Sequence, residues 1–288
     1  MQLTHGWRNV LPPKVVDRYE VLETRNAATI LKATDLAAFT EVLQTLDRFS
    51  LTAAHLLLAG GNEGLVAKQL NAAMRKRGWR EARVDTSVQH TLVKFRAPGT
   101  NETAETTWRP PAQSWEGYKA DWVKGRVAGD CEWNAKDGNL DRNFASYRSL
   151  YEAGFIDGAV LVTRTMFDLR ELEATLISEL MQVGAEQAAA VTGYPLKGFK
   201  ASIERINKAR AEGKKELRLG TTTSTNTTKI IERLKRGDGG GCPILVLGIC
   251  ARTFDGVRLN APPPGRLTQP VATLTEDEML DESNWADE

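Results

Sequence analysis

One short segment limits the fold of this chain more than any other part of the sequence. Residues 126–133 read Arg-Val-Ala-Gly-Asp-Cys-Glu-Trp, so small or apolar side chains alternate with a set that ends in two acids. A period of two is typical of a β-strand, in which successive side chains point to opposite faces of the sheet. Asp130 and Glu132 therefore share one face, and Cys131 lies on the other. The pattern predicts a strand that carries two carboxylates side by side.

A third acid lies close by in the sequence. Asp121 stands nine positions before Asp130 and precedes a predicted turn at residues 124–125, so it can fold back toward the same point. Neighbouring carboxylates raise one another's pKa unless a cation lies between them. Their oxygens favour magnesium, manganese or calcium over zinc, and the Cys131 carbonyl offers a further ligand. The pattern predicts a divalent-metal site, while a solvated strand face remains the alternative on chemistry alone.

The rest of the sequence alternates between helical and strand patterns. Apolar residues recur at spacings of three and four in the first part of the chain, which predicts helices over residues 19–31, 36–49 and 63–77. Further on we expect strands within 80–95 and over 126–133, 159–163 and 244–249, and helices over 140–151, 168–191 and 197–212. This order indicates an α/β fold, with a mixed β-sheet flanked by helices.

Composition divides the chain into three parts. We expect an N-terminal helical part with the first strands at residues 1–96, a core at 97–260 that opens on a loop over 97–112, and a Pro-rich, then acidic, disordered tail at 261–288. The formal net charge is +1, but the last thirteen residues contain seven acids and no Lys or Arg, which leaves +8 on the remainder. A basic body suits a polyanionic partner.

Two further features favour a cytoplasmic protein. No apolar run reaches the roughly 18 residues that a membrane span needs, and the N-terminus carries no signal-peptide pattern, so we expect no membrane partner. The three cysteines are widely spaced, and they provide neither a zinc framework nor a disulfide framework. Buried thiols in a reducing compartment are the interpretation that fits them.

An ordered set of segments resembles a known family. The run D-W-V-K-G-R-V-A-G-D-C-E-W-N-A-K-D-G-N-L-D-R resembles the core of BglII-like type II restriction endonucleases, which belong to the PD-(D/E)xK nuclease superfamily. Other segments follow the family in the same order, namely G-G-N-E-G-L-V-A-K-Q-L, R-G-W-R-E, A-G-F-I-D-G-A-V-L-V-T-R-T, G-T-T-T-S-T-N-T-T-K-I and G-G-G-C-P-I-L-V-L-G-I. The resemblance covers about residues 19–253 and implies a restriction-endonuclease-like core.

The resemblance assigns roles to the acids. Asp121 matches the first metal-binding aspartate, Asp130 the second acid and Glu132 the third position, so these three are the expected catalytic residues. Asp121, Asp130 and the Cys131 carbonyl are the expected ligands of Mg²⁺, with Mn²⁺ as a substitute and Ca²⁺ binding without supporting cleavage. The chain departs from the pattern twice, because Asp130 replaces the usual Glu and Glu132 fills a position that is often Lys. An acid there acts as base or ligand and supplies no positive charge.

A second register stays open. It takes Glu132 and Asn134 as the second and third positions, and Lys136 falls on the same face if the strand continues. We rank it lower because Gly138 and Asn139 predict the end of the strand.

The resemblance also implies partners and products. It implies a homodimer that cuts both strands of a palindromic duplex DNA site, products with 5′ phosphates, and a cognate DNA methyltransferase in the host. A nuclease of repair or recombination that recognises DNA structure is one alternative, and a catalytically silent DNA-binding protein is another. Expected DNA contacts lie around the core and in the threonine-rich segment, which can also cap the following helix. They are Asn134, Lys136, Arg142, Thr222, Thr223, Ser224, Asn226 and Lys229.

Overall fold

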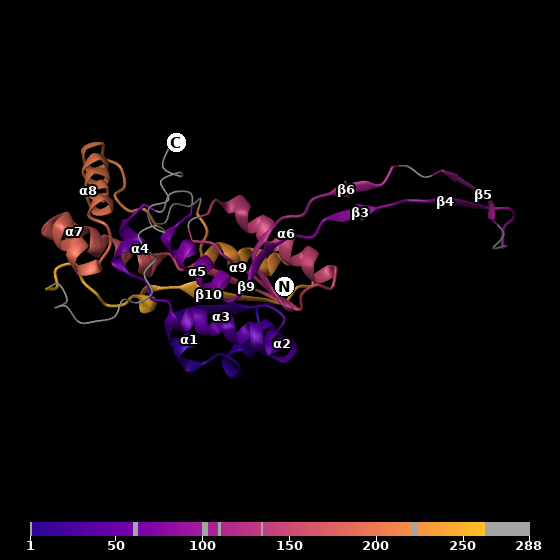
Figure 1. Ribbon diagram of the computed structural model, residues 1–288, viewed down its shortest axis with the longest axis horizontal. Helices are drawn as coiled ribbons and strands as arrows, with labels where there is room; N and C mark the ends of the chain where they lie inside the picture. Colours follow the sequence, from indigo (N-terminus) through magenta and orange to yellow (C-terminus); the bar gives the residue numbers. More distant parts are fainter. Residues whose placement is uncertain are drawn as a thin grey trace.

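The most apolar runs of the chain form the middle of a mixed sheet. The computed structural model describes residues 2–59, 63–99, 103–108, 111–133, 135–219 and 224–262. Its central sheet has the strand order β1-β10-β9-β8-β7-β2 (Figure 1). The strands are β1 (Tyr19–Glu23), β10 (Ile244–Ile249), β9 (Gly158–Arg164), β8 (Val127–Cys131), β7 (Ala120–Lys124) and β2 (Arg80–Ala82). The β10–β9 and β9–β8 pairs are parallel, and the other three pairs are antiparallel.

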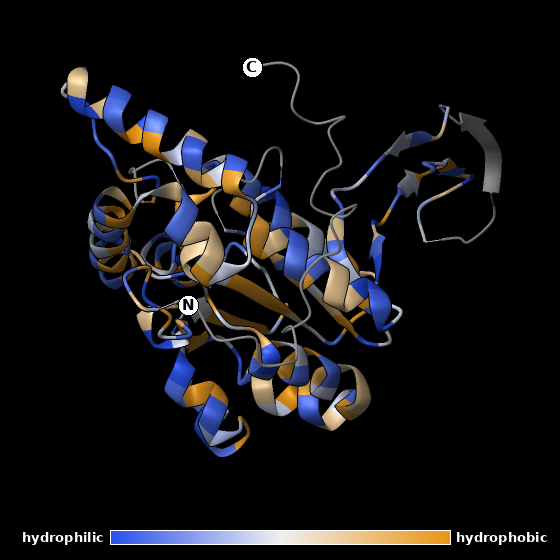
Figure 2. Ribbon diagram, turned by 60° about the vertical axis from the view of Figure 1, so that its left-hand side comes forward, coloured by the Kyte–Doolittle hydropathy of each residue, from blue (hydrophilic) through white to orange (hydrophobic). Residues whose placement is uncertain are grey.

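Helices cover both faces of this sheet, as the predicted fold class requires. Side chains of β8, β9 and β10 alternate between two hydrophobic cores, one on each face. Figure 2 shows the hydrophobic strands lying between helices that are hydrophilic on their outer sides. The larger core contacts α1 (Pro13–Arg18), α2 (Ala27–Thr34), α3 (Leu36–Arg48), α4 (Ala53–Leu57), α5 (Leu65–Lys76), α7 (Phe167–Thr192) and α8 (Leu196–Ala211). The smaller core contacts α6 (Asp137–Glu152) and α9 (Thr227–Arg236).

Two short ladders form an arm that projects from the body (Figure 1). Between β2 and β7, strand β3 (Thr86–Val88) pairs with β6 (Gln113–Trp115), and β4 (Leu92–Phe95) pairs with β5 (Thr103–Trp108). Residues 97–112, predicted to be a loop, therefore contain β5, and the boundary expected at residue 97 lies between β4 and β5. Both β1 and β2 belong to the same sheet as β7 to β10.

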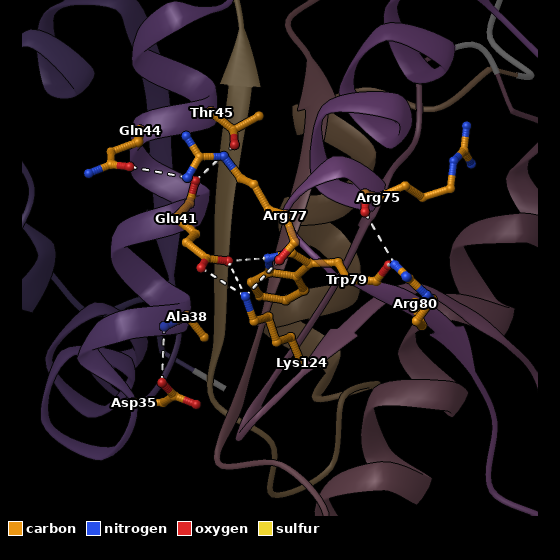
Figure 3. Close-up of polar contacts among 10 residues, drawn as sticks. All are labelled: Asp35, Ala38, Glu41, Gln44, Thr45, Arg75, Arg77, Trp79, Arg80 and Lys124. Carbon is orange, nitrogen blue, oxygen red and sulfur yellow. Dashed lines mark hydrogen bonds and ion pairs between the residues drawn. The ribbon is translucent and has the colours of Figure 1, made fainter.

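The turn between β7 and β8 is hydrogen-bonded to the N-terminal helices. Lys124 Nζ donates to both Glu41 carboxylate oxygens at 2.8 Å and to the Arg77 carbonyl at 2.7 Å. Trp79 Nε1 donates to the same carboxylate at 2.8 Å (Figure 3). Asp35 caps α3 and also accepts from the Arg126 backbone N–H at 2.9 Å. These bonds fix the turn end of the hairpin against α3.

Most of the predicted elements appear, but besides the loop predicted over residues 97–112 a second prediction is wrong. The helix expected over residues 19–31 is strand β1 followed by α2, because the first five residues pair with β10 and positive φ angles at Arg25 and Asn26 interrupt the chain. The strand predicted over 126–133 ends at Cys131. The tail from residue 263 onward lies outside the described residues. In the described part of the chain, no helix has the length and apolar character that crossing a membrane demands.

At Gly125 in the hairpin turn, the structure leaves no room for a side chain. Its φ is +53°, and a Cβ there would overlap the Asp35 carboxylate, which would have to leave its two backbone donors. Gly193→Ala is the matched control, since its φ is +73° and nothing lies within 4 Å of an added Cβ. We expect Gly193→Ala to lower the free energy of unfolding by about 1–2 kcal/mol through backbone strain. Gly125→Ala should lower it by more. Urea unfolding of both variants measures the difference, and equal losses would contradict it.

Candidate active site

The β7–β8 hairpin brings two of the predicted acids together. Trp122 pairs with Gly129, so Asp121 and Asp130 follow as the next opposed positions at the open end of the hairpin. The Asp121 backbone N–H donates to Asp130 Oδ1 at 2.9 Å. Gly129 lets β8 lie close to β9 and to the Trp122 ring, because a Cβ there would meet the Val160 carbonyl at 2.6 Å and the ring at 3.0 Å. The hairpin therefore places two carboxylates at one edge of the sheet.

Glu132 joins them in an open pocket of about 350 Å³. It follows β8 directly, and its backbone N–H still donates to the Val162 carbonyl at 2.8 Å. The pocket lies where the arm, the hairpin and α6 meet. Its lining residues are Arg83, Gly117, Tyr118, Lys119, Asp121, Asp130, Glu132, Asn139, Arg142 and Asn143. All three acids proposed from the sequence thus face a single cavity.

Burial makes the charged forms of these acids unfavourable. Burial, and then the charge of Asp121, raises the pKa of Asp130 well above its usual range. Burial also raises the pKa of Asp121, with further contributions from the charges of Glu63 and Glu81. The Glu132 pKa rises from 4.5 to about 7, chiefly through burial, although a hydrogen bond from Asn143 opposes the shift. Binding a proton or a cation would remove the energetic cost of these buried, mutually repelling carboxylates.

The donor set fits a hard cation. Asp130 is 3% exposed, and its Oδ2 has no hydrogen-bond partner among the described residues. An unpaired buried carboxylate oxygen is costly unless a proton or a metal completes it. Across the described ranges, no three or more His, Cys, Asp or Glu side chains are arranged to hold a metal ion. Magnesium needs fewer than three such side chains, since it is commonly bound through one or two carboxylates together with water and substrate oxygens.

Two side chains of α6 contact these acids and were not predicted from the sequence. Asn143 Nδ2 donates to Glu132 Oε1 at 3.0 Å. Tyr147, one helical turn later, is fully buried, and its hydroxyl interacts with Asp130, which it reaches outside full hydrogen-bond geometry. The sequence pattern placed Tyr147 in an apolar stripe of this helix. The available signal was the polar residue four positions before it, on the same helical face.

Two of the expected DNA contacts, Lys136 and Ser224, lie side by side although they come from separate segments. Lys136 forms a β-bridge with Ser224, and the Thr225 backbone N–H donates to the Ala135 carbonyl at 3.0 Å. Ser224 and Thr225 therefore lie directly beside the chain that leaves β8. Arg164 links both, because it donates to the Trp133 carbonyl at 2.9 Å and to Ser224 Oγ at 2.7 Å.

The side chains expected to contact DNA differ in their exposure to solvent. Lys136 and Arg142 are exposed, and the Arg142 guanidinium lies 5.8 Å from the centre of the Tyr118 ring. Lys229 is half-buried, and Asn226 is buried and caps α9 by accepting from the Lys229 backbone N–H at 3.2 Å. Three expected contacts, Asn134, Thr222 and Thr223, lie outside the described residues. The second register includes Asn134, so its third position also lies outside the described residues.

A mixed sheet between helices, with acids clustered at the open end of a hairpin, defines a protein with the restriction-endonuclease-like fold. The chain belongs to the family described as restriction endonuclease BglII/BglIII, which its residues 19–249 match. The match covers about four fifths of the chain and includes every element of the central sheet. Membership makes the chain a nuclease of a restriction-enzyme family, and DNA is the substrate of that family. None of the curated proteins matches the chain.

The pKa of Glu132 predicts how stability depends on pH in the absence of metal. Because its pKa is about 7 in the folded chain and about 4.5 when exposed, the stability that the protonated group contributes is complete below about pH 4.5 and is lost as the pH rises through 7. We expect Glu132→Gln to recover on the order of 1–3 kcal/mol of the stability lost between about pH 5 and pH 8. Urea unfolding in EDTA at both pH values measures this, and parallel pH profiles would refute it.

Proposed function

We propose that this chain is a type II restriction endonuclease that hydrolyses duplex DNA at a specific site with Mg²⁺. The observation that supports this most directly is the pocket shared by Asp121, Asp130 and Glu132, in which the buried Asp130 Oδ2 has no partner in full hydrogen-bond geometry among the described residues. Such an arrangement is unfavourable for folding alone and suitable for holding a divalent cation beside a reacting phosphate.

The three acids have different roles in the proposed mechanism. Asp121, Asp130 and the Cys131 carbonyl would hold the ion, which would supply the charge that polarises the scissile phosphate and lowers the pKa of a water molecule. Glu132 orients that water or accepts its proton, and a pKa of about 7 suits a base that works near neutral pH. The 3′ oxygen leaves, so the products carry 5′ phosphates. Mn²⁺ would replace Mg²⁺, whereas Ca²⁺ would bind without supporting cleavage.

The biological setting follows from the same proposal. A palindromic site is cut in both strands most simply by a homodimer with two active sites related by a twofold axis. A cognate DNA methyltransferase would protect the host's own sites, and both proteins would act in the cytoplasm. Lys136 and Arg142 are the exposed cations that we propose for DNA contacts beside the acids.

Cleavage of unmethylated phage DNA tests this function. We expect the protein to give discrete fragments with Mg²⁺ and none with EDTA, and we expect Asp121→Ala to bind DNA without cutting it, because it lacks a metal ligand. Asp17→Ala is the matched control, since it removes an exposed acid from α1 and should cut normally.

The possible outcomes separate the alternatives. Cutting of branched but not linear duplex would favour a structure-specific repair nuclease. Binding without cleavage under any metal would favour a silent DNA-binding protein and overturn the proposal. Cleavage by Asp121→Ala at the wild-type rate would show that the acids of the pocket are not the active site.

Arg142 allows a separate test of DNA binding. We expect Arg142→Ala to weaken DNA binding in EDTA and to reduce the slope of log affinity against log salt by about one, because one phosphate contact is lost. Lys197→Ala removes an exposed cation from α8, at the opposite end of the molecule from the arm (Figure 1), and should leave that slope unchanged. Fluorescence anisotropy over a range of salt concentrations gives both slopes. Equal slopes for the two variants would exclude Arg142 from the interface.

A further inference from the structure

Helix α6 presents two buried polar side chains to the acids of the pocket. Asn143 and Tyr147 are 5% and 0% exposed, and they stand four residues apart, which puts them on one face of the helix. Their neighbours Leu140, Phe144 and Leu150 pack into the smaller core against the sheet. The helix is therefore held firmly, and so are the two polar groups that it carries.

The contact made by Asn143 is a directed hydrogen bond. Its Nδ2 lies 3.0 Å from Glu132 Oε1, and the amide is almost fully buried, so water competes little for this bond. Glu132 stands one position beyond the end of β8, and its backbone N–H still donates to the Val162 carbonyl of β9. The amide of Asn143 thus provides a fixed donor for a carboxylate that still lines the pocket.

Tyr147 faces the other acid of the strand. The Tyr147 hydroxyl and the Asp130 carboxylate interact, yet neither the hydroxyl nor Asp130 Oδ2 has a partner in full hydrogen-bond geometry among the described residues. Asp130 Oδ1 is already occupied by the Asp121 backbone N–H. A phenylalanine would fill the same apolar space without burying a hydroxyl, which is unfavourable unless the hydroxyl is bonded. The presence of this buried hydroxyl is explained if it helps to orient the Asp130 carboxylate.

We propose that Asn143 and Tyr147 are the positioning residues of the active site, with Asn143 orienting Glu132 and the Tyr147 hydroxyl orienting Asp130 toward the cation. The inference rests on the proposed function and deepens it. Carboxylates that bind metals are themselves held by hydrogen bonds from a surrounding layer, and losing such a bond typically costs about 10–100-fold in metal affinity or activity. Arg142 and Asn139 on the same helix line the pocket. Helix α6 therefore contributes both the residues that contact the acids and part of the pocket wall.

Tyr147→Phe tests the assignment with the least disturbance. The variant keeps the ring in the core and removes only the hydroxyl, so we expect normal folding and normal DNA binding in EDTA. The Mg²⁺ concentration for half-maximal single-turnover cleavage should rise about tenfold or more. Binding of Mn²⁺, followed by electron paramagnetic resonance of the free ion, should weaken by a similar factor, and this readout does not depend on cleavage.

Asn143→Ala and Ser146→Ala complete the design. Asn143→Ala should lower the cleavage rate at saturating Mg²⁺, with less effect on Mn²⁺ binding, because Glu132 is assigned to water and not to the ion. Ser146 lies on the same helix, and its buried hydroxyl bonds to no described residue, so Ser146→Ala is the matched control for removing a hydroxyl. It should match the wild type in cleavage, Mn²⁺ binding and DNA binding.

The outcomes separate this inference from the function on which it rests. A wild-type chain that cuts DNA, with Tyr147→Phe equal to it in both metal dependences, would overturn the role of Tyr147. A wild-type chain that binds Mn²⁺ without cutting, with weaker binding in Tyr147→Phe, would support positioning and reject the endonuclease. A wild-type chain that neither binds Mn²⁺ nor cuts would overturn both proposals.

Discussion

The arrangement of the site depends on how the β7–β8 hairpin is anchored. Its turn end is fixed by Lys124 between the Glu41 carboxylate and the Arg77 carbonyl, and by Asp35 on the Arg126 backbone N–H. The acids lie at the other, open end. Because the hairpin is held by contacts remote from the acids, their mutual repulsion does not have to be balanced where they meet. The fold can therefore keep like charges together in a pocket.

This arrangement lowers the stability of the metal-free protein. Burial raises the pKa of Asp121, Asp130 and Glu132 together, so folding favours their protonated forms at a pH where free carboxylates are charged. The rest of the sheet compensates, since β9 and β10 are buried along their whole length between two cores. A bound cation would reverse the balance, because it would stabilise the charged forms that burial disfavours.

The sequence was informative where a short period and local spacing decide the structure. Alternation along 126–133 predicted that Asp130 and Glu132 share a face, and they do line one pocket. Residues 19–31 were misassigned, because β1 is selected by its pairing with β10, more than two hundred residues away, and local spacing carries no trace of that pairing. The contacts of Asn143 and Tyr147 were missed for a related reason. A helical stripe indicates which side is buried, but not which polar groups on the sheet it will meet.

One buried cation joins the chain that follows β8 to the segment that precedes α9. Arg164 at the end of β9 is fully buried, and burial lowers its pKa to about 10, where it still carries its charge near neutral pH. It donates to the Trp133 carbonyl, just past Glu132, and to Ser224 in the segment that precedes α9. A charge that is buried in this way is held only where its donors are satisfied. Ser224 is therefore linked through Arg164 to the chain just past the strand that carries Asp130, and displacing either one breaks a hydrogen bond of Arg164.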